Sequence, residues 1–263
     1  MRLDQYLYIN KYFDSRNKST EAIKRGEVFI DGKVVNKPSF LIDESNSYRV
    51  EIKQNKSFVS LGGYKLSKAL DDFSFNVAGL VVADIGASTG GFTDCLLQNG
   101  ASTVFSVDVN EDLLHDRLRG NIKVKPLIKN AKELVRSDFS LPLNLICADL
   151  SFISLTQVIG VFYELIDYNC HVILLIKPQF EMGKRIKFKN GIVRDEKLRI
   201  EAVKGVCLEC LNSGFMPLKI TTAPIVDNKN IEYLILLKKQ EKREIDNTHE
   251  LVENLFNFNF IQK

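Results

Sequence analysis

Residues 81–93, with the sequence VVADIGASTGGFT, combine a strand pattern with a glycine-rich turn, and this combination indicates the fold class. The first five residues are mostly apolar and predict a buried strand, and the glycines predict a tight turn that opens a helix. A phosphate-binding loop requires a Gly-Lys-Ser/Thr sequence, and none follows here. The Gly-x-Gly-x-x-Gly dinucleotide motif is also incomplete, because Ser88 occupies the position of its second glycine. The turn therefore predicts a backbone that approaches a ligand without a diphosphate, although a purely structural turn stays open.

Further apolar runs alternate with helical patterns on both sides of this stretch. They lie at residues 104–107, 143–148, 172–176 and 231–237. Runs of Val, Ile and Leu separated by helices are typical of a parallel sheet buried on both faces. Residues 58–263 are therefore expected to form one α/β domain of the Rossmann-like type.

Acidic residues at two strand ends suggest the ligand. Asp84 lies just before the turn, and Asp108 ends the next strand, where a carboxylate can bind a ribose diol. This pair favours S-adenosylmethionine as the cofactor. The residues expected to bind it are Asp84, Gly86, Ser88, Thr89, Gly90, Gly91, Phe92, Asp108, Asn130 and Asp149.

Charged residues also stand at the ends of later strands. Asp149 follows the run 143–148, Lys177 follows 172–176, and Glu232 lies at the start of 231–237. Ligands of open α/β sheets bind outside the carboxyl ends of strands, so Asp149 and Lys177 are expected to face one crevice. A buried ion pair that only fixes the strands is the alternative. Lys65 lies on an expected helix, and its spacing alone indicates no more than a solvated side chain.

Residues 1–57 read as a separate small domain that ends in a short polar linker at 53–57. An amphipathic helix is expected from Leu3, and Ser19 and Thr20 are expected to cap a second helix. A hairpin is predicted around Asp31-Gly32, with a last short strand at 48–52.

The net charge of +3 is unevenly distributed. Residues 1–60 contain 11 lysines and arginines against 8 aspartates and glutamates, whereas the remaining residues contain 25 of each. Basic side chains of this kind bind phosphates, and an ordinary charged surface is the alternative. The clusters at 184–189 and 238–239 are expected to extend a phosphate-binding surface. The residues expected to bind RNA are Arg2, Arg16, Lys18, Lys24, Arg25 and Lys37.

Composition argues against several other classes of protein. The five cysteines are sparse and odd in number, so a disulfide framework is not expected, and no spacing predicts a metal site. No apolar run approaches the ~20 residues that a membrane-spanning helix needs. A cytoplasmic protein with no obligate protein partner and no membrane contact is expected.

The motifs together resemble a known family. The first domain resembles the ribosomal-protein-S4-like RNA-binding domain, and the remainder resembles the FtsJ-like 2′-O-ribose methyltransferases. The combination resembles the TlyA (hemolysin A) family from about residue 2 to 238. The motifs that carry the likeness are RLD at 2–4, DGK at 31–33, GYKL at 63–66, ADIGASTGGFT at 83–93, DLSFISL at 149–155, KPQFE at 177–181 and GIVRD at 191–195.

This resemblance implies an enzyme that uses S-adenosylmethionine to methylate a cytidine 2′-hydroxyl in bacterial ribosomal RNA. It also implies a Lys-Asp-Lys-Glu tetrad, which falls on Lys65, Asp149, Lys177 and Glu232. The family's shorter form acts on the large subunit, and a start at Arg2 without a basic extension favours that form. Leu61 replaces an arginine of the family's pattern, and the loop 224–232 is one residue shorter and lacks both of the family's glycines. A non-catalytic, RNA-binding ribosome assembly factor and a membrane-active hemolysin are the alternative functions.

Overall fold

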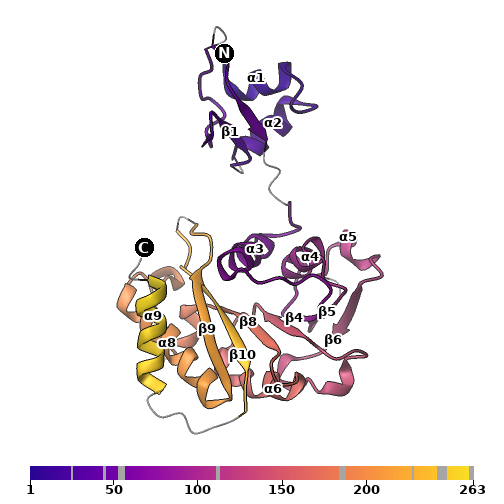
Figure 1. The fold of residues 1–263 in the computed structure, drawn as a ribbon, viewed down its shortest axis with the longest axis vertical. Coiled ribbons are helices and arrows are strands. Elements are labelled where there is room, and N and C mark those ends of the chain that lie inside the picture. Colours follow the sequence, from indigo (N-terminus) through magenta and orange to yellow (C-terminus); the bar gives the residue numbers. More distant parts are fainter. Residues whose placement is uncertain are drawn as a thin grey trace. The chain divides into compact units, whose positions relative to one another are not determined.

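The computed structural model describes residues 1–24, 26–43, 46–52, 57–110, 113–183, 188–226, 228–241 and 248–260. The chain divides into two compact units, Met1–Ser57 and Phe58–Lys263, and each has its own hydrophobic core. Figure 1 labels most of their helices and strands. The predicted linker at 53–57 lies outside the described residues except for Ser57.

The first unit packs two helices, α1 (Leu3–Ile9) and α2 (Arg16–Lys24), with a small antiparallel sheet. In the described residues this sheet has three strands in the order β2-β1-β3. They are β1 (Val28–Ile30), β2 (Lys33–Val34) and β3 (Val50–Ile52). The predicted hairpin and last strand are therefore present.

The predicted start of the second helix is wrong. Helix α2 begins at Arg16, and the hydroxyl of Ser15 accepts a hydrogen bond from the Lys18 N–H at 3.2 Å. Ser19 is buried inside the helix, where its hydroxyl donates to the Ser15 carbonyl. Ser15 takes the capping role because it precedes the helix, where the first N–H groups lack partners.

The second unit is built on one mixed sheet, which has seven strands in the described residues. Five neighbouring strands are parallel, as expected, but β10 runs antiparallel to both β8 and β9, so the expectation of a wholly parallel sheet is wrong. In spatial order the strands are β6 (Val124–Ile128), β5 (Thr103–Asp108), β4 (Val81–Ile85), β7 (Leu145–Ala148), β8 (His171–Ile176), β10 (Tyr233–Lys239) and β9 (Phe215–Thr222).

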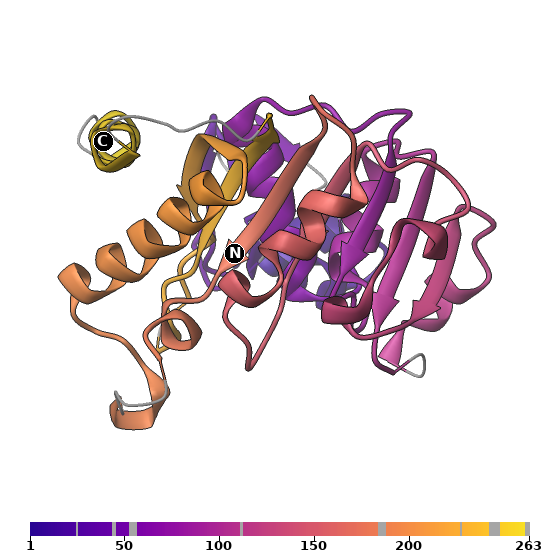
Figure 2. The same cartoon turned by 90° about the horizontal axis from the view of Figure 1, so that it is seen from below.

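Helices cover both faces of this sheet. Helices α3 and α4 pack on one face and α6 and α8 on the other, and side chains of β4, β5 and β7 alternate between the two cores. Figures 1 and 2 show α8 and α9 beside the β9 edge. The helices of this unit are α3 (Leu61–Phe73), α4 (Gly91–Gln98), α5 (Asp116–Arg119), α6 (Ile159–Leu165), α7 (Pro178–Glu181), α8 (Glu196–Asn212) and α9 (Thr248–Phe260), with short 3-10 turns η2 (Ala131–Glu133), η3 (Arg136–Asp138), η4 (Leu155–Gln157) and η5 (Lys189–Gly191).

The strand order creates a crevice at one edge of the sheet. The chain passes from β4 to β5 on one side and later returns to β7 on the other side of β4. The loops after β4 and β7 therefore diverge at a topological switch point, where open α/β sheets bind ligands. Because β10 is antiparallel to β8, the residue before β10 also lies at this edge.

The cluster Lys238-Lys239 lies at the opposite edge, since Lys238 pairs with His171 at the start of β8. Lys239 is buried, and its ammonium donates to the carbonyls of Tyr163 and Ile166. The expectation that it binds phosphate near the crevice is therefore wrong, because the antiparallel direction of β10 was not foreseen. Of the cluster at 184–189, residues 184–187 lie outside the described residues.

No helix in the described ranges is long and apolar enough to cross a membrane.

Candidate active site

The turn after β4 can only be made with glycine at two positions. Gly86 has a φ of +83°, and a Cβ added there would lie 2.5 Å from the carbonyl oxygen of Asp149. Gly90 has a φ of +90° and would clash with Leu118. A larger residue at position 86 would therefore push apart the loops after β4 and β7 that border the crevice.

Glycines also bring helix α3 against the start of α4. A Cβ on Gly91 would lie 2.2 Å from the Ser60 hydroxyl oxygen and 2.9 Å from the Gly63 nitrogen. A Cβ on Gly63 would meet the Gly91 carbonyl oxygen at 2.9 Å. This close approach sets α3, which carries Lys65, beside the crevice.

Asp84 lies at the base of the turn and is fully buried. One carboxylate oxygen accepts a hydrogen bond from the Thr93 hydroxyl at 2.6 Å, and the other has no partner in the described part of the chain. Burial raises the pKa of Asp84 to about 7, and the nearby Asp149 carboxylate acts in the same direction. Asp84 thus links the end of β4 to helix α4 through Thr93, and its Oδ1 atom remains an unsatisfied acceptor beneath the turn.

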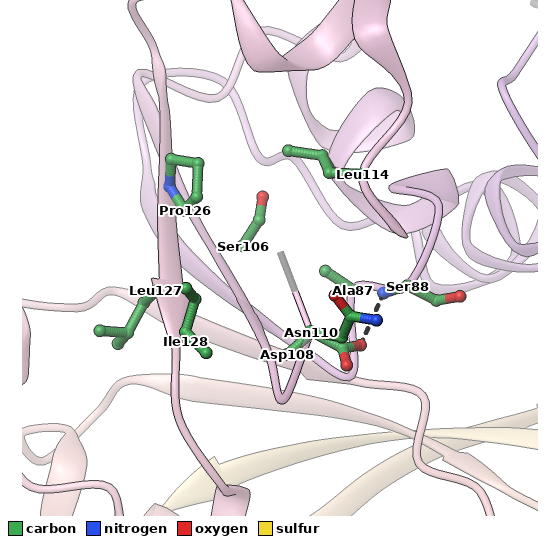
Figure 3. Close-up of a pocket in the computed structure, with 9 residues that line it drawn as sticks. All are labelled: Ala87, Ser88, Ser106, Asp108, Asn110, Leu114, Pro126, Leu127 and Ile128. Atoms are coloured by element: carbon green, nitrogen blue, oxygen red, sulfur yellow. Dashed lines mark hydrogen bonds between the residues drawn. The ribbon is translucent and has the colours of Figure 1, made fainter. Parts of the chain in front are cut away.

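Asp108 stands at the end of β5 in a pocket that Figure 3 shows. Its carboxylate accepts hydrogen bonds from the backbone N–H of Ser88 at 2.8 Å and of Val109 at 2.7 Å. Both carboxylate oxygens are thereby oriented and keep lone pairs for further donors. The other residues that line this pocket are Ala87, Ser106, Asn110, Leu114, Pro126, Leu127 and Ile128.

A second, more polar pocket shares Ala87 and Ser88 with the first. Its other lining residues are Ser60, Gly62, Gly86, Thr89, Gly91, Phe92 and Asp149. The two pockets therefore meet at the glycine turn, with apolar walls and a carboxylate at one end and polar groups at the other. This division fits a nucleoside joined to an amino-acid tail, as in S-adenosylmethionine.

Three predicted cofactor residues, Asp84, Gly90 and Asn130, line neither pocket, and Asn130 is the one that lies outside the glycine turn and its base. It follows β6, and its amide oxygen accepts a hydrogen bond from the Lys132 N–H at 3.0 Å, at the start of η2. Its side chain is thereby committed to the backbone of its own turn.

Lys177 is the most enclosed cation at the crevice, with a side chain only 10% exposed. Its ammonium lies 2.6 Å from the Asp149 carboxylate and donates to the Ser151 hydroxyl at 2.7 Å. Two of its three N–H donors can be used in these contacts. The third is left for a group that enters the crevice.

Lys65 and Glu232 form a second ion pair, at 2.5 Å. Tyr233 pairs with Ile176 across β10 and β8, so Glu232 and Lys177 are the next residues along these two neighbouring strands. The sheet thus brings Lys65, Glu232, Asp149 and Lys177 to one edge, although they are up to 167 positions apart in sequence.

Three residues at this edge were not predicted from the sequence. Ser151 contacts Lys177, Phe152 is 91% exposed with a φ of +67°, and Glu181 binds the segment around Ser154. Their sequence signal was present, since all three belong to the motifs DLSFISL and KPQFE. Within the described residues, no cluster of His, Cys, Asp or Glu could hold a metal ion.

The basic residues of the first unit are placed differently. The guanidinium groups of Arg2 and Arg16 both bind the buried carboxylate of Asp4, at 3.0 and 2.9 Å, while their side chains stay about half exposed. Burial opposes ionisation of Asp4, but the two arginines outweigh it and hold its pKa below the usual range. Lys18 pairs with Asp14 on the surface, Lys24 and Lys37 are exposed, and Arg25 lies outside the described residues.

Comparison with known proteins gives the chain two matching family models. Residues 58–240 match the FtsJ-like methyltransferases, and residues 1–46 match the S4 domain. A relative from Brachyspira hyodysenteriae named hemolysin A is 38% identical over 239 residues, covering 89% of this chain and 98% of the relative. The 16S/23S rRNA (cytidine-2′-O)-methyltransferase TlyA of Mycobacterium tuberculosis is 34% identical and covers 93% of this chain and 92% of the relative.

Solved structures agree with this relationship. A structure named as a hemolysin from Streptococcus thermophilus is 32% identical, with a TM-score of 0.69, and covers 96% of this chain and 93% of that one. An S-adenosylmethionine-dependent methyltransferase from Mesorhizobium loti shares the fold of the second unit, with a TM-score of 0.52 at 16% identity, over 68% of this chain and all of that one. The chain therefore belongs to the TlyA (hemolysin A) family of FtsJ-like methyltransferases, whose cofactor is S-adenosylmethionine, and its first unit is an S4 domain.

Proposed function

We propose that this protein transfers the methyl group of S-adenosylmethionine to the 2′-hydroxyl of a cytidine in ribosomal RNA. The observation that carries the proposal is the ammonium of Lys177, held by Asp149 and Ser151 beside the glycine turn. Relatives named as rRNA cytidine-2′-O-methyltransferases, among them the 31% identical 23S enzyme of Campylobacter jejuni, support the substrate.

The groove suits the cofactor in two parts. Asp108 would accept hydrogen bonds from the ribose hydroxyls, and Leu114, Leu127 and Ile128 would contact the adenine ring. The methionine portion would lie along the turn, near Gly86 and Asp149. When bound there, the cofactor supplies an electrophilic methyl group on a sulfonium.

Lys177 and its partners would act on the nucleophile. The 2′-oxygen would bond to the methyl carbon while the carbon–sulfur bond breaks and its electron pair stays on sulfur. The proton of the hydroxyl would pass to water in the crevice. The third donor of Lys177 would hydrogen-bond the 2′-oxygen and stabilise its developing negative charge. Asp149 would hold Lys177 in place, and alignment of oxygen and methyl at about 3 Å would supply much of the acceleration.

Lys65 and Glu232 would bound the other side of the reacting ribose. Their ion pair lies next to Lys177 along the β8–β10 edge. We propose that Lys65 and Glu232 position the ribose hydroxyls, so that all four members of the Lys-Asp-Lys-Glu set act on one nucleotide.

The S4 domain would supply RNA affinity. Arg2 and Arg16, oriented by Asp4, and the exposed Lys24 and Lys37 are suited to bind phosphates. A ribosomal subunit is the proposed partner, and the cytoplasm is the proposed location of the reaction. The large subunit as target stays a prediction.

A labelling experiment separates this function from that of a non-catalytic assembly factor. Purified protein is incubated with tritium-labelled S-adenosylmethionine and with ribosomal subunits from a strain that lacks the gene, with transfer RNA as the control. We expect label in ribosomal RNA and none in transfer RNA. Tight RNA binding without label, or without cofactor binding by calorimetry, would favour an assembly factor instead.

A further inference from the structure

We propose that Glu181 is a positioning residue for the methyl transfer, because it holds the loop that carries Asp149, Ser151 and Phe152 against helix α7. This inference rests on the proposed function, since it assumes that Lys177 acts on the acceptor hydroxyl. It assigns a role to a carboxylate outside the Lys-Asp-Lys-Glu set.

Glu181 binds the far end of this loop with both carboxylate oxygens. One oxygen accepts a hydrogen bond from the Ser154 hydroxyl at 2.5 Å, and the other accepts one from the Leu155 N–H at 3.1 Å. The Leu155 N–H is among the first of η4, whose N-cap is Ser154. Glu181 thus fixes the point where the loop becomes the η4 turn.

The near end of the loop is attached to the same helix through Lys177. Lys177 is the N-cap residue of α7, and Glu181 is its last residue, so one helical turn carries both contacts. The Lys177 ammonium binds Asp149 and Ser151, at the start of the loop. The loop is therefore clamped at both ends by residues four positions apart.

The middle of the loop needs this support. Phe152 adopts a φ of +67°, which is unfavourable for a bulky side chain, and is 91% exposed. Such a conformation persists when surrounding contacts over-determine it. The ring of Phe180, also on α7, lies 5.3 Å from the ring of Phe152 and gives a third point of attachment.

The Glu181 carboxylate is largely buried, which disfavours its charged form. Burial raises its pKa, and the hydrogen bonds from Ser154 and Leu155 only partly offset this. A residue that merely capped η4 would affect stability alone. A positioning residue must also change the rate at which bound substrate reacts, since Asp149 and Ser151 would shift relative to Lys177.

Two substitutions at Glu181 separate these roles. Glu181→Ala removes both acceptors, whereas Glu181→Gln keeps an oxygen for Leu155 N–H and an amide that can donate to the Ser154 oxygen. We expect Glu181→Ala to lower kcat by about 10- to 100-fold, because a misplacement of about 1 Å can cost 100-fold. Glu181→Gln should stay within about 3-fold of wild type, since it preserves the geometry.

The kcat values are measured by transfer of labelled methyl groups to ribosomal RNA, and further variants provide controls for folding and for cofactor binding. Ser154→Ala removes one clamp contact from the loop side and should lower kcat by about 5-fold, even if Glu181→Ala does not fold. Glu253→Ala on α9 breaks a surface pair with Lys204 on α8 and should leave kcat unchanged. Glu253→Ala should also leave the Kd for S-adenosylmethionine unchanged. Glu181→Ala and Ser154→Ala should change that Kd less than they change kcat, because, among Asp149, Ser151 and Phe152, only Asp149 lines a cofactor pocket.

The outcomes separate the inference from the function on which it rests. An inactive wild-type protein would contradict the proposed function. Active wild type with Glu181→Ala or Ser154→Ala at full kcat, or with Glu181→Gln as slow as Glu181→Ala, would overturn the positioning role. A fall in kcat under saturating cofactor that glutamine rescues supports it.

Discussion

Two carboxylates, Asp4 in the S4 domain and Asp149 in the catalytic domain, each hold cations in a different way. Asp4 is buried and binds Arg2 and Arg16, whose side chains stay about half exposed. Asp149 is less buried and binds Lys177, whose side chain is only 10% exposed. The first arrangement presents charge to solvent, where it can meet phosphates, and the second keeps charge inside a crevice, where electrostatic effects on a reaction are larger.

The largest effect is expected when the enclosed cation is removed. Lys177→Ala should lower kcat by about 1,000-fold or more, because the developing oxyanion loses its main stabilising charge. The Kd for S-adenosylmethionine should change less than about 3-fold, since Lys177 lines neither cofactor pocket. Methyl transfer under saturating cofactor, together with calorimetry, measures both, and Lys204→Ala on α8 is the matched control. If the kcat of Lys177→Ala stayed within 10-fold of wild type, the enclosed cation held by Asp149 would not have the catalytic role that distinguishes it from the exposed cations held by Asp4.

A smaller effect of another kind is expected for the exposed cations. The double variant Arg2→Ala and Arg16→Ala should raise the KM for ribosomal subunits by about 10-fold and leave kcat nearly unchanged. The slope of log affinity against log salt should become shallower by about 2, one for each lost phosphate contact. Filter binding across salt concentrations checks the slope. An altered kcat with an unchanged slope would show that these arginines do not act through phosphates.

The smallest effect concerns a third carboxylate, Asp84, which is buried without a cation. Its folded pKa of about 7 exceeds the usual value near 3.8, so the folded state binds more protons between these values. Stability of the cofactor-free catalytic domain should therefore fall as the pH rises from about 4 to about 7. Asp84→Asn, which stays neutral, should weaken this dependence by a few degrees of Tm. Calorimetric melts across that pH range measure it, and identical profiles for the two proteins would contradict the assignment.

Much of the catalytic domain could be predicted because its central strands are long apolar runs. The strands at 81–85, 104–107, 143–148 and 172–176 all appear, with ends shifted by two residues at most. The edge strands β6 and β9 were missed because each contains a proline and exposed positions, which an edge tolerates and a hydrophobic pattern does not reveal.

Site residues at the ends of the central strands could likewise be predicted, whereas those that depend on the edge strands or on distant contacts could not. Asp108, Asp149 and Lys177 could be placed because a strand end fixes each position along the chain. The direction of β10 could not be read from its sequence, so the partnership of Glu232 with Lys65 rested on the family resemblance. Ser151 and Glu181 lie in recognisable motifs, but their roles were missed because they depend on side-chain contacts across 26 and 27 positions, which the motifs alone do not reveal.

The most direct test of the account is the identity of the modified nucleoside. Ribosomal RNA that has been incubated with purified protein and trideuteromethyl S-adenosylmethionine is digested to nucleosides and analysed by mass spectrometry. The account predicts trideuterated 2′-O-methylcytidine with wild type, formed about 1,000-fold more slowly or not at all with Lys177→Ala. Label on a nucleobase, on another nucleoside, or absent despite measured cofactor binding would contradict it.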